Sequence, residues 1–351
     1  MIKVDIYDLS LGDLQALLAE MGEPKFRAKQ LYRQLYVNWA ESPEEMSDLS
    51  KALRSKLSEQ VVFGAIELVR VFSGDKGMTR KAVWKLPGGE TIETVLMVYK
   101  DRATVCVSSQ AGCPMGCVFC ATAKLGFMQD LTSGQMIAQV LWAARELKGI
   151  DEHKRLSNVV YMGMGEPFNN YDPWWGSVDR LHDPNGFNLG ARSFTVSTVG
   201  LIPGIERLAK ESLPINLAIS LHTAYDERRS ALMPVNRKYP IADLIAASRA
   251  YAAETGRRVS FEYCLIKGEN DSIEEANALA DLLLADRFPC HINLIPWNPV
   301  SGTALERSTR DAVNAFQAEL EARGVPCTIR IQRGVDIDAA CGQLAGAEAA
   351  T

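Results

Sequence analysis

The sequence predicts an α/β fold: a partial (β/α) barrel that follows a small N-terminal helical domain and a β-hairpin extension. Strand and helix patterns alternate from about residue 101 to residue 346, which is typical of a parallel sheet with right-handed helical crossovers. Several strands run into glycine-rich or polar segments, and the first runs into a loop with three cysteines. Because the chemistry of such barrels lies at the carboxyl ends of the strands, these observations agree with one another.

Residues 1–62 have a helical pattern. Ser10 and Asp13 have the spacing of a capping box, and Gly22 follows the apolar positions of this first helix. Another helix is expected from Ser47 to Glu59. We therefore predict a helical accessory domain over residues 1–62; the basic stripe described next is the reason to consider RNA binding as its role.

A basic stripe lies in the second helix of this section. Lys25, Lys29 and Arg33 recur every four residues, so they share one helical face. Such a stripe is most often a solvated face, and the alternative is a surface that binds the phosphates of a nucleic acid. The residues alone leave both interpretations open.

Residues 63–100 change to a β pattern. Ser73–Gly77 and Leu86–Glu90 have the composition of hairpin turns. We expect an antiparallel β-hairpin extension that leads into the main domain.

The main domain is expected over residues 101–346, including a C-terminal segment. Its strands are predicted over Val105–Ser109, Asn158–Met162, Phe194–Thr198, Asn216–Leu221, Val259–Leu265, His291–Ile295 and Cys327–Ile331. Its helices are predicted over Ser133–Lys148, Ile205–Glu211, Ile241–Glu254, Ile273–Ala285 and Arg310–Ala322. The last five or so residues, which are rich in alanine, are expected to fray.

The composition restricts the class of protein. With 351 residues, 47% of them apolar and 23% charged, the chain is typical of a soluble globular protein. No apolar run approaches the ~18 residues of a membrane helix, and no signal-peptide pattern opens the chain. Its eight cysteines fit a reducing compartment, so we expect a cytoplasmic protein without membrane contact. The formal net charge of −5 means that any RNA surface must come from local basic patches.

Cys113, Cys117 and Cys120 have the spacing C-x3-C-x2-C. Three close thiolates can hold a 4Fe-4S cluster, and because such a cluster usually takes four cysteines, one iron stays open to bind a substrate. The alternatives are a zinc site with a distant fourth ligand, or a fortuitous cluster. Zinc sites favour paired C-x2-C motifs, and the chain has no second pair. The spacing resembles the radical-SAM superfamily motif, in which the open iron binds S-adenosylmethionine (SAM).

Glycines and polar residues follow several predicted strands. Singly they are weak indicators, because such residues at strand ends commonly form turns. Their recurrence beside the cysteine loop favours a shared SAM site. The segments concerned are Gly163–Pro167, Ser197–Gly200, Ser220–His222 and Pro296–Pro299.

Segments spread along the chain then carry a more specific resemblance. They are Glu93–Val95, Asp101–Cys106, the cysteine loop, Gly163–Pro167, Asn293–Pro299 and Gly334–Leu344. Together they closely resemble the RlmN/Cfr family of radical-SAM RNA adenine methyltransferases, and within it the RlmN branch. The resemblance covers nearly the whole chain, including the N-terminal helices, and it implies a barrel of the radical-SAM type.

The resemblance implies that the protein methylates carbon 2 of an adenosine in the peptidyl transferase centre of 23S rRNA. Many members also methylate the tRNA adenosine just 3′ of the anticodon. Carbon 2 is electron-poor and has no lone pair, so radical chemistry is needed. One SAM methylates Cys341 by displacement, and a second is cleaved at the cluster to a radical that activates this methyl group.

Further roles follow from the same resemblance. Cys106 resolves the RNA adduct by forming a disulfide with Cys341, so the C-terminal segment is expected to fold back over the barrel. Glu93 matches the base that removes the carbon 2 proton, with Cys106 as the competing candidate. The positions carried over for SAM binding are Gly165, Glu166, Ser197, Ser220, Leu221, His222 and Asn298.

Without the family resemblance, the same residues would be assigned ordinary structural roles. Without the family pattern, Cys106 is a small buried hydrophobe, His222 a satisfied strand-end histidine and Glu93 an exposed hairpin charge. Cys264, Cys290 and Cys327 are predicted to be buried hydrophobes.

For RNA contact we expect a basic set after the fourth strand, together with the stripe at Lys25, Lys29 and Arg33. The basic set is Arg228, Arg229, Arg237 and Lys238. The target adenine has to be unstacked to reach the radical. The family also implies a reductant such as flavodoxin, and we expect a monomer.

The chain departs from the family pattern at Met97–Lys100 and Ile331–Gly334, which bears on substrate preference. A Cfr-like enzyme that methylates carbon 8 is the alternative within the chemistry. A non-catalytic RNA-binding or ribosome assembly protein and a zinc-stabilised protein are the alternatives of other classes.

Overall fold

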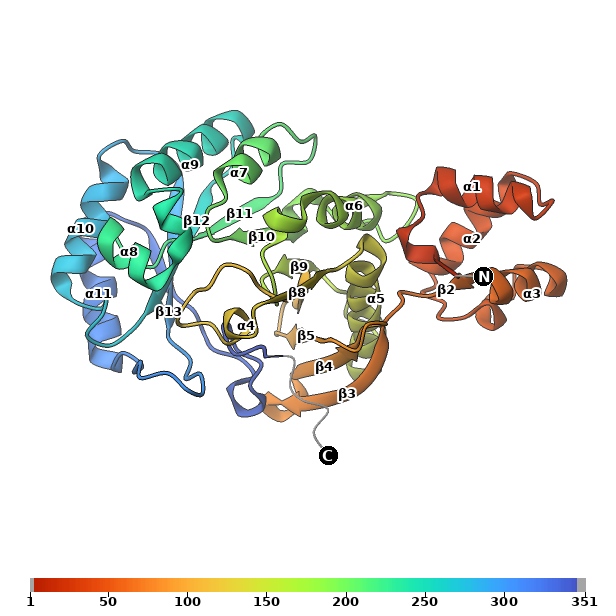
Figure 1. Ribbon diagram of the computed structural model, residues 1–351, viewed down its shortest axis with the longest axis horizontal. Coiled ribbons are helices and arrows are strands. Elements are labelled where there is room, and N and C mark those ends of the chain that lie inside the picture. The colour runs from red at the N-terminus through yellow and green to blue at the C-terminus, as the bar shows by residue number, and fades with distance from the viewer. Residues whose placement is uncertain (1–2, 346–351) are drawn as a thin grey trace.

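A ten-stranded mixed sheet organises the computed structural model, which describes residues 3–345 (Figure 1). The strand order is β14-β13-β12-β11-β10-β9-β6-β5-β4-β3. The strands from β6 to β14 pair in parallel, and those from β3 to β6 pair antiparallel. Because β14 and β3 lie at opposite ends of this order, the parallel part forms an open, partial barrel. The alanine-rich end that was expected to fray lies outside the described residues.

The parallel strands are those that the alternation predicts, with ends shifted by up to three residues. They are β6 (Ala103–Cys106), β9 (Asn158–Tyr161), β10 (Phe194–Thr198), β11 (Asn216–Ser220), β12 (Val259–Leu265), β13 (Cys290–Pro296) and β14 (Cys327–Ile329). The largest shift is at β6, which ends at Cys106 because the chain then enters a separate two-stranded sheet. That sheet pairs β7 (Gln110–Gly112) with β8 (Phe127–Asp130).

Helices lie between these strands and cover the outer face of the barrel (Figure 1). Those that the sequence predicts are α5 (Ser133–Ile150), α7 (Ile202–Leu208), α9 (Ile241–Thr255), α10 (Ile273–Leu284) and α11 (Arg310–Ala322). The prediction omitted α4 (Ala121–Lys124), α6 (Tyr171–His182) and α8 (Asp226–Leu232). In α6 the proline at position 173 suggests a turn, but it lies in the first helical turn, where a missing N–H costs nothing.

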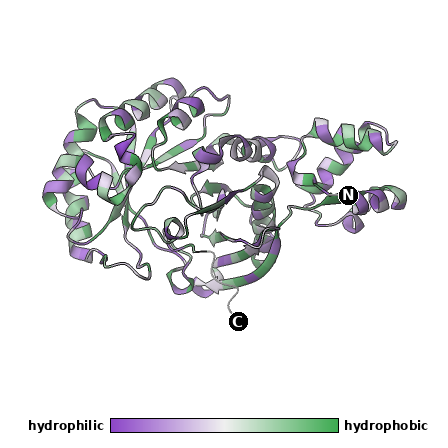
Figure 2. Cartoon of the chain, in the orientation of Figure 1, coloured by the Kyte–Doolittle hydropathy of each residue, from purple (hydrophilic) through white to green (hydrophobic). Residues whose placement is uncertain are grey.

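The outer helices are amphipathic. In α11, Val313, Phe316 and Leu320 are buried, and the Thr309 hydroxyl caps the helix by accepting a bond from Ala312 N. Figure 2 shows hydrophilic and hydrophobic residues alternating along these outer helices. Within residues 3–345, no helix combines the length and the apolar character that crossing a membrane requires.

The N-terminal unit contains α1 (Leu11–Glu20), α2 (Phe26–Tyr36) and α3 (Lys51–Gln60). The short strands β1 (Val4–Asp5) and β2 (Val61–Val62) pair in parallel and tie its two ends together. Ser10 and Asp13 form the predicted capping box. Lys25, Lys29 and Arg33 are all exposed at the start and along the outer side of α2.

This unit is joined to the barrel through α5. The Asp8 carboxylate accepts a bond from Gly134 N, 2.6 Å away, at the first turn of α5, where a helix favours negative charge. Arg145 on α5 donates to Trp39 O at 3.1 Å and pairs with Glu41 at 2.8 Å. The buried apolar residues of the unit and of the barrel form one continuous core.

The β-hairpin extension consists of β3 (Glu67–Gly74), β4 (Thr79–Lys85) and β5 (Thr91–Val98). The two predicted turns lie between these strands. Since β5 pairs with β6, the extension continues the barrel sheet.

Arg229 corrects one prediction. It was expected to contact RNA, but its side chain is fully buried. Its guanidinium donates to Val199 O at 2.7 Å, Ser220 O at 3.0 Å and Leu221 O at 3.2 Å, and to Asn236 Oδ1 at 2.9 Å. The prediction was wrong because carbonyls at the ends of β10 and β11 converge here, and a guanidinium can satisfy several of them at once.

Arg229→Met should therefore destabilise the fold. The substitution leaves buried carbonyl groups without donors, so the free energy of unfolding should fall by about 3 kcal/mol or more. Chemical denaturation measures this change. The control Arg237→Met, at an exposed site, should change it by less than about 0.5 kcal/mol. Equal losses in the two variants would contradict the structural role of Arg229.

Candidate active site

The three cysteines of the motif lie on the loop between β7 and α4. At Gly112, which starts this loop, φ is +67° and a Cβ would lie 1.8 Å from Gly126 O, so only glycine fits. Burial raises the pKa of the Cys113 thiol to about 12 and that of Cys117 well above its usual value, and the charge of Cys120 adds to both shifts. The three sulfurs therefore lie close together, and those of Cys113 and Cys117 are desolvated.

This donor set fits a 4Fe-4S cluster. Soft thiolates are the usual ligands of such clusters, and each cysteine binds a different iron. Within residues 3–345 no three His, Cys, Asp or Glu side chains have the compact arrangement that holds a single ion. A cluster does not require that arrangement, because its ligands are spread around a larger group. Cys113, Cys117 and Cys120 would hold it.

Glu166 lies beside this loop, after β9. At Gly165, φ is +99° and a Cβ would lie 2.6 Å from Gln110 Cβ, so a glycine is required for the close approach. The buried Glu166 carboxylate accepts bonds from Phe168 N at 3.1 Å and Val199 N at 2.8 Å. Burial raises its pKa to about 7. It is a fixed, desolvated acceptor that would be stabilised by a cationic group.

Ser197, Ser220 and Leu221 lie at the same end of the barrel, at the carboxyl ends of β10 and β11. Both serines are half-buried. Leu221 N donates to Glu262 O at 3.1 Å, which extends the pairing with β12. The predicted SAM residues of three successive strands are thus brought together.

His222 follows in the left-handed backbone conformation, with φ at +64°. Its Nδ1 accepts a bond from Cys264 N at 2.9 Å, and its carbonyl accepts one from Asn270 Nδ2 at 2.6 Å. The ring packs edge-to-face against Phe119, with 4.8 Å between centroids. Burial lowers its pKa to about 3, so the imidazole is neutral.

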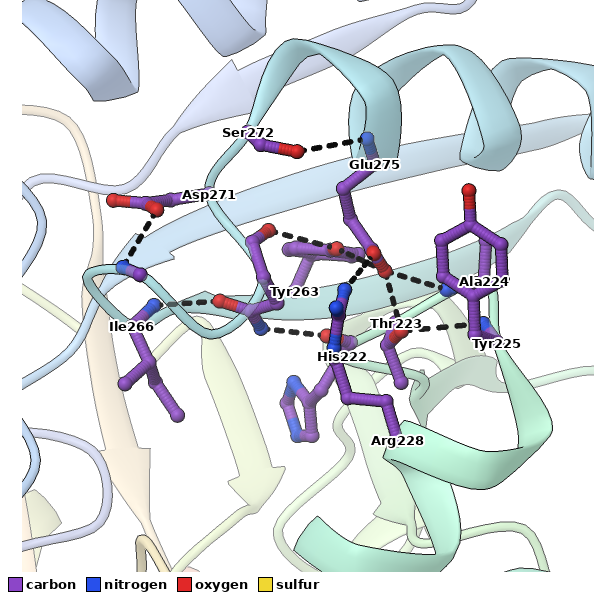
Figure 3. Close-up of polar contacts among 12 residues, drawn as sticks. His222, Thr223, Ala224, Tyr225, Arg228, Tyr263, Ile266, Asp271, Ser272 and Glu275 are labelled. Carbon is purple, nitrogen blue, oxygen red and sulfur yellow. Dashed lines mark hydrogen bonds and ion pairs between the residues drawn. The ribbon is translucent and has the colours of Figure 1, made fainter.

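A buried carboxylate, that of Glu275, fixes the loop after His222 (Figure 3). It accepts bonds from Ala224 N at 2.9 Å, from Tyr263 Oη at 3.0 Å and from the Thr223 hydroxyl. The Arg228 guanidinium also pairs with it, although Arg228 was expected to contact RNA. The structure gives this arginine a partner within the fold.

Cys106 and Cys341 are far apart in the sequence but close enough in the fold for their charges to interact. Cys106 ends β6 and is buried, and Cys341 follows the short 3-10 helix η7 (Val335–Ile337). Burial raises the pKa of both thiols, and the Cys341 charge contributes to the shift at Cys106. All eight cysteines are free.

Cys341 is exposed as a residue, whereas burial raises the pKa of its thiol. Part of the residue is therefore in contact with solvent, while the protein around the thiol raises its pKa.

The C-terminal segment, residues 334–345, folds back over the barrel as expected. On one side it bonds to the cysteine loop, where Ala121 N donates to Gly342 O at 2.8 Å and Thr122 Oγ1 donates to Leu344 O at 2.6 Å. Asn298 Nδ2, from the predicted SAM set, donates to Cys341 O at 2.9 Å.

The other side of the segment bonds to the β-hairpin extension. Gly334 N donates to Asp75 Oδ2 at 2.9 Å, and Lys81 Nζ donates to Asp338 O at 3.3 Å. Ala345 N donates to Glu93 Oε2 at 3.2 Å. The segment thus bridges the two walls of the open barrel.

Glu93 is buried on β5 and pairs with Lys81 Nζ at 3.2 Å. Its register places it on the sheet face of Cys106, because Val95, two positions along, pairs with Cys106. Glu93 is therefore not the exposed hairpin charge that the residue alone would suggest.

Sequence reasoning missed three residues of this region: Lys81, Glu262 and Arg330. Glu262 and Cys264 lie two positions apart on β12, so they share a face. Cys264 is buried as predicted, and burial together with the charge of Cys341 raises the pKa of its thiol. The alternation along β12 was the available signal. Lys81 and Arg330 carried no signal of their own.

Two family models match the chain. The model described as the ribosomal RNA large subunit methyltransferase N-terminal domain matches residues 4–63, and the radical SAM superfamily model matches residues 107–280. A relative from Chloroflexus aurantiacus, named a probable dual-specificity RNA methyltransferase RlmN, is 60% identical over 97% of this chain and 92% of its own length. The chain belongs to the RlmN family.

Other RlmN relatives agree over the same extent. One from Roseiflexus sp. (strain RS-1) is 53% identical and covers 98% of this chain and 96% of its own. A crystal structure of a radical SAM methyltransferase from Sphaerobacter thermophilus superposes with a TM-score of 0.94 at 48% identity, over 98% of this chain and 99% of that one. As an RlmN-family protein, this chain is a SAM-dependent methyltransferase whose cofactors are a 4Fe-4S cluster and SAM.

The neutral state of His222 predicts a pH dependence of stability. Its pKa in the folded state is about 3, below its usual 6.5, so below pH 6.5 the unfolded chain binds a proton that the folded chain does not. Stability is then lost as the pH falls, by about 1.4 kcal/mol per pH unit from this residue. His222→Asn, which tolerates the same backbone conformation, removes this contribution.

Denaturation of the cluster-free protein between pH 7 and pH 5 tests this prediction. The stability of the wild type relative to His222→Asn should decline as the pH falls. The exposed residue His153 provides the control, because His153→Asn should show no such trend. A constant difference between wild type and His222→Asn would rule out the prediction.

Proposed function

We propose that this chain methylates carbon 2 of a specific adenosine in the peptidyl transferase centre of 23S rRNA, and of the adenosine 3′ of the anticodon in tRNA. The observation that carries the proposal is that the C-terminal segment folds back over the barrel and brings Cys341 close enough to Cys106 for the charges of the two thiols to interact. A second RNA class is supported by the dual specificity in the names of the RlmN relatives.

The cysteine loop and the carboxyl ends of the strands are the proposed cofactor-binding elements. Cys113, Cys117 and Cys120 hold the 4Fe-4S cluster, which when bound supplies the electron for reductive cleavage of SAM. The buried Glu166 carboxylate is our candidate for binding the SAM ammonium group. The wider set for SAM is Gly165, Glu166, Ser197, Ser220, Leu221, His222 and Asn298.

Cys341 is the methyl carrier. Its thiolate attacks the methyl group of one SAM, forming a sulfur–carbon bond while S-adenosylhomocysteine leaves. After the methyl carbon is joined to adenine, Cys106 attacks the Cys341 sulfur. The sulfur–sulfur bond forms as the bond from sulfur to the carried carbon breaks. The electron pair leaves with the carbon, which takes up a proton to become the methyl group, and the RNA is freed. The proximity of the two thiols supports this order of roles.

Glu93 is our candidate for the base that removes the carbon 2 proton. It is buried, shares a sheet face with Cys106 and bonds to the C-terminal segment. Lys81 would stabilise its carboxylate form. Cys106 remains the competing candidate, because its thiol and that of Cys341 interact.

RNA is expected to approach across exposed basic residues. Lys25, Lys29 and Arg33 are exposed on α2, and Arg237 and Lys238 are exposed after α8. We further propose that the protein works in the cytoplasm as a monomer and receives electrons from a carrier such as flavodoxin.

Substitution of the two thiols tests the proposed roles. Cys341→Ala should abolish methylation, because no sulfur remains to carry the methyl group. Cys106→Ala should trap RNA covalently on the protein, since the adduct cannot be resolved. Anaerobic reconstitution with SAM and separate rRNA and tRNA fragments, followed by nucleoside mass spectrometry and gel analysis, measures both results.

Two outcomes would count against the proposal. Free turnover by Cys106→Ala would contradict its resolving role. Formation of 8-methyladenosine without 2-methyladenosine by the wild type would point to the Cfr-like reaction at carbon 8.

The basic face of α2 predicts a salt effect. If Lys25, Lys29 and Arg33 contact phosphates, converting all three to glutamate should weaken RNA binding and reduce the slope of log affinity against log salt by about 2 to 3. Titration of labelled tRNA at several salt concentrations measures the slope. The control converts the exposed residues Lys76 and Lys85, on the β-hairpin extension, and should leave the slope nearly unchanged. Equal slopes for the wild type and the α2 variant would assign RNA contact elsewhere.

A further inference from the structure

A cavity of about 430 Å³ lies inside the barrel, on the amino-end side of the candidate SAM residues. Its lining begins near the starts of β10 and β11, at Thr195 and Asn216, and reaches Met162, directly after β9. The cavity reaches the surface at Gly256 and Arg258, which are exposed before β12. Its volume lies in the range of about 300–1,000 Å³ that is usual for small-molecule sites and is sufficient for a nucleoside.

The strand register joins this cavity to the proposed active site. Cys106 pairs with Val160 of β9, and Met162, two positions further on, lies on the same face of the sheet. In the same way Ser220, from the predicted SAM set, pairs with Glu262, which lines the cavity. The cavity, Cys106 and the SAM residues of β11 therefore share the inner face of the barrel.

One buried carboxylate oxygen in this cavity lacks a hydrogen-bond donor. Glu262 is only 4% exposed, and its Oε1 accepts a bond from Asn293 Nδ2 at 2.8 Å. Its Oε2 has no hydrogen-bond partner among the described residues and lies 3.7 Å from Arg330 Nε, an ion pair without a hydrogen bond. Because a buried acceptor without a donor is costly, this oxygen points to a ligand that carries an N–H or O–H group.

Hydrogen-bond donors lie next to this acceptor. The two terminal nitrogens of Arg330 lie 3.8 and 4.0 Å from Met162 Sδ, and a thioether is only a weak acceptor. The cavity therefore offers an acceptor beside N–H groups that a stronger acceptor would engage. The Watson–Crick edge of adenine is complementary, because its N6 amino group donates and its N1 accepts.

Basic residues border the opening of the cavity. Arg258 is exposed, and Arg257 is half-buried, with no hydrogen-bond partner for its Nε among the described residues. Another nitrogen of Arg257 donates to Asn216 Oδ1, which fixes the side chain at the cavity wall. Guanidinium groups bind phosphates well, so this opening suits the backbone of a nucleic acid at a flipped nucleotide.

We propose that this cavity receives the flipped adenosine and that Glu262, held by Asn293, is the residue that selects adenine. Glu262 Oε2 accepts a hydrogen bond from the N6 amino group and Arg330 donates to N1. Arg257 and Arg258 hold the flanking phosphates. The inference rests on the proposed function, which makes an adenosine in RNA the substrate, and it names the residues that read the base.

Binding of a labelled anticodon stem-loop to the reconstituted enzyme tests the inference. Three RNAs differ only at the nucleotide 3′ of the anticodon, which is adenosine, purine riboside or inosine. Purine riboside lacks the N6 amino group, so the wild type should bind this RNA about tenfold more weakly than the adenosine RNA. Equal affinity of the wild type for these two RNAs would overturn the inference without any protein variant.

Glu262→Gln should change which base is preferred. Asn293 holds the carbonyl oxygen of the new amide in the place of Oε1, so an N–H group replaces Oε2 in the cavity. The variant should bind the adenosine and purine riboside RNAs equally well. It should bind the inosine RNA about tenfold better than the wild type does, because O6 of inosine accepts a hydrogen bond.

The control is Glu269→Gln, at an exposed site after β12, which should select among the three RNAs as the wild type does. If Glu262 only supports the fold, Glu262→Gln should weaken binding of all three RNAs by the same factor. Such a uniform loss, or an unchanged preference, would overturn the inference.

Nucleoside mass spectrometry separates this inference from the proposed function. If the wild type, given SAM and a reductant, forms 2-methyladenosine on neither the adenosine stem-loop nor the rRNA fragment, the proposed function fails. If it forms 2-methyladenosine but binds the adenosine and purine riboside RNAs equally well, the function stands and the assignment of Glu262 fails.

Discussion

The arrangement of this protein depends on the bridge that its C-terminal segment makes across an open barrel. The parallel sheet ends at β14 on one side and continues through β6 into the antiparallel strands on the other. Without a further element, the space between these walls would be open to water. The segment spans it by accepting a hydrogen bond from Asn298, after β13, on one side and by bonding to Asp75 and Lys81 of the β-hairpin extension on the other. It also bonds to Ala121 and Thr122 of α4. That span is what brings Cys341 to Cys106.

Buried polar groups keep the strand ends in place around this bridge. Arg229 gathers the carbonyls after β10 and β11, and Glu275 gathers donors from the following loop. Each is almost completely buried, and a buried charge of this kind is tolerated only when its hydrogen bonds are made. The buried hydrogen bonds of Arg229 and Glu275 therefore fix the loops that hold the candidate SAM residues.

Much of this could be predicted from the sequence, because the patterns involved are local. The strands of the barrel, the capping box at Ser10 and the two hairpin turns follow from periodicity and turn chemistry. The family resemblance then led to Cys341 and its partner thiol. Helix α6 was missed because its proline and glycine suggest a loop, although tertiary packing of its tryptophans favours the helix.

Other features depend on contacts between distant parts of the chain, and no local pattern reveals them. Arg228 and Arg229 are neighbours in a basic sequence, which suggests an RNA surface. Only the fold shows that Glu275 and the strand-end carbonyls take up both side chains. Lys81 and Arg330 were not predicted as site residues for the same reason, because each forms an ion pair with a glutamate on another strand.

The way in which residues 334–345 are held has an evolutionary consequence. Six hydrogen bonds to the walls use main-chain atoms of the segment, those of Gly334, Asp338, Cys341, Gly342, Leu344 and Ala345. The side chains of the segment add to this: Asp336 accepts a bond from Asp75 N, Gln343 donates to Pro299 O, and Leu344 is buried. The segment and the surfaces that receive it are therefore constrained to change together, because a misfit on either side would displace the reactive sulfur.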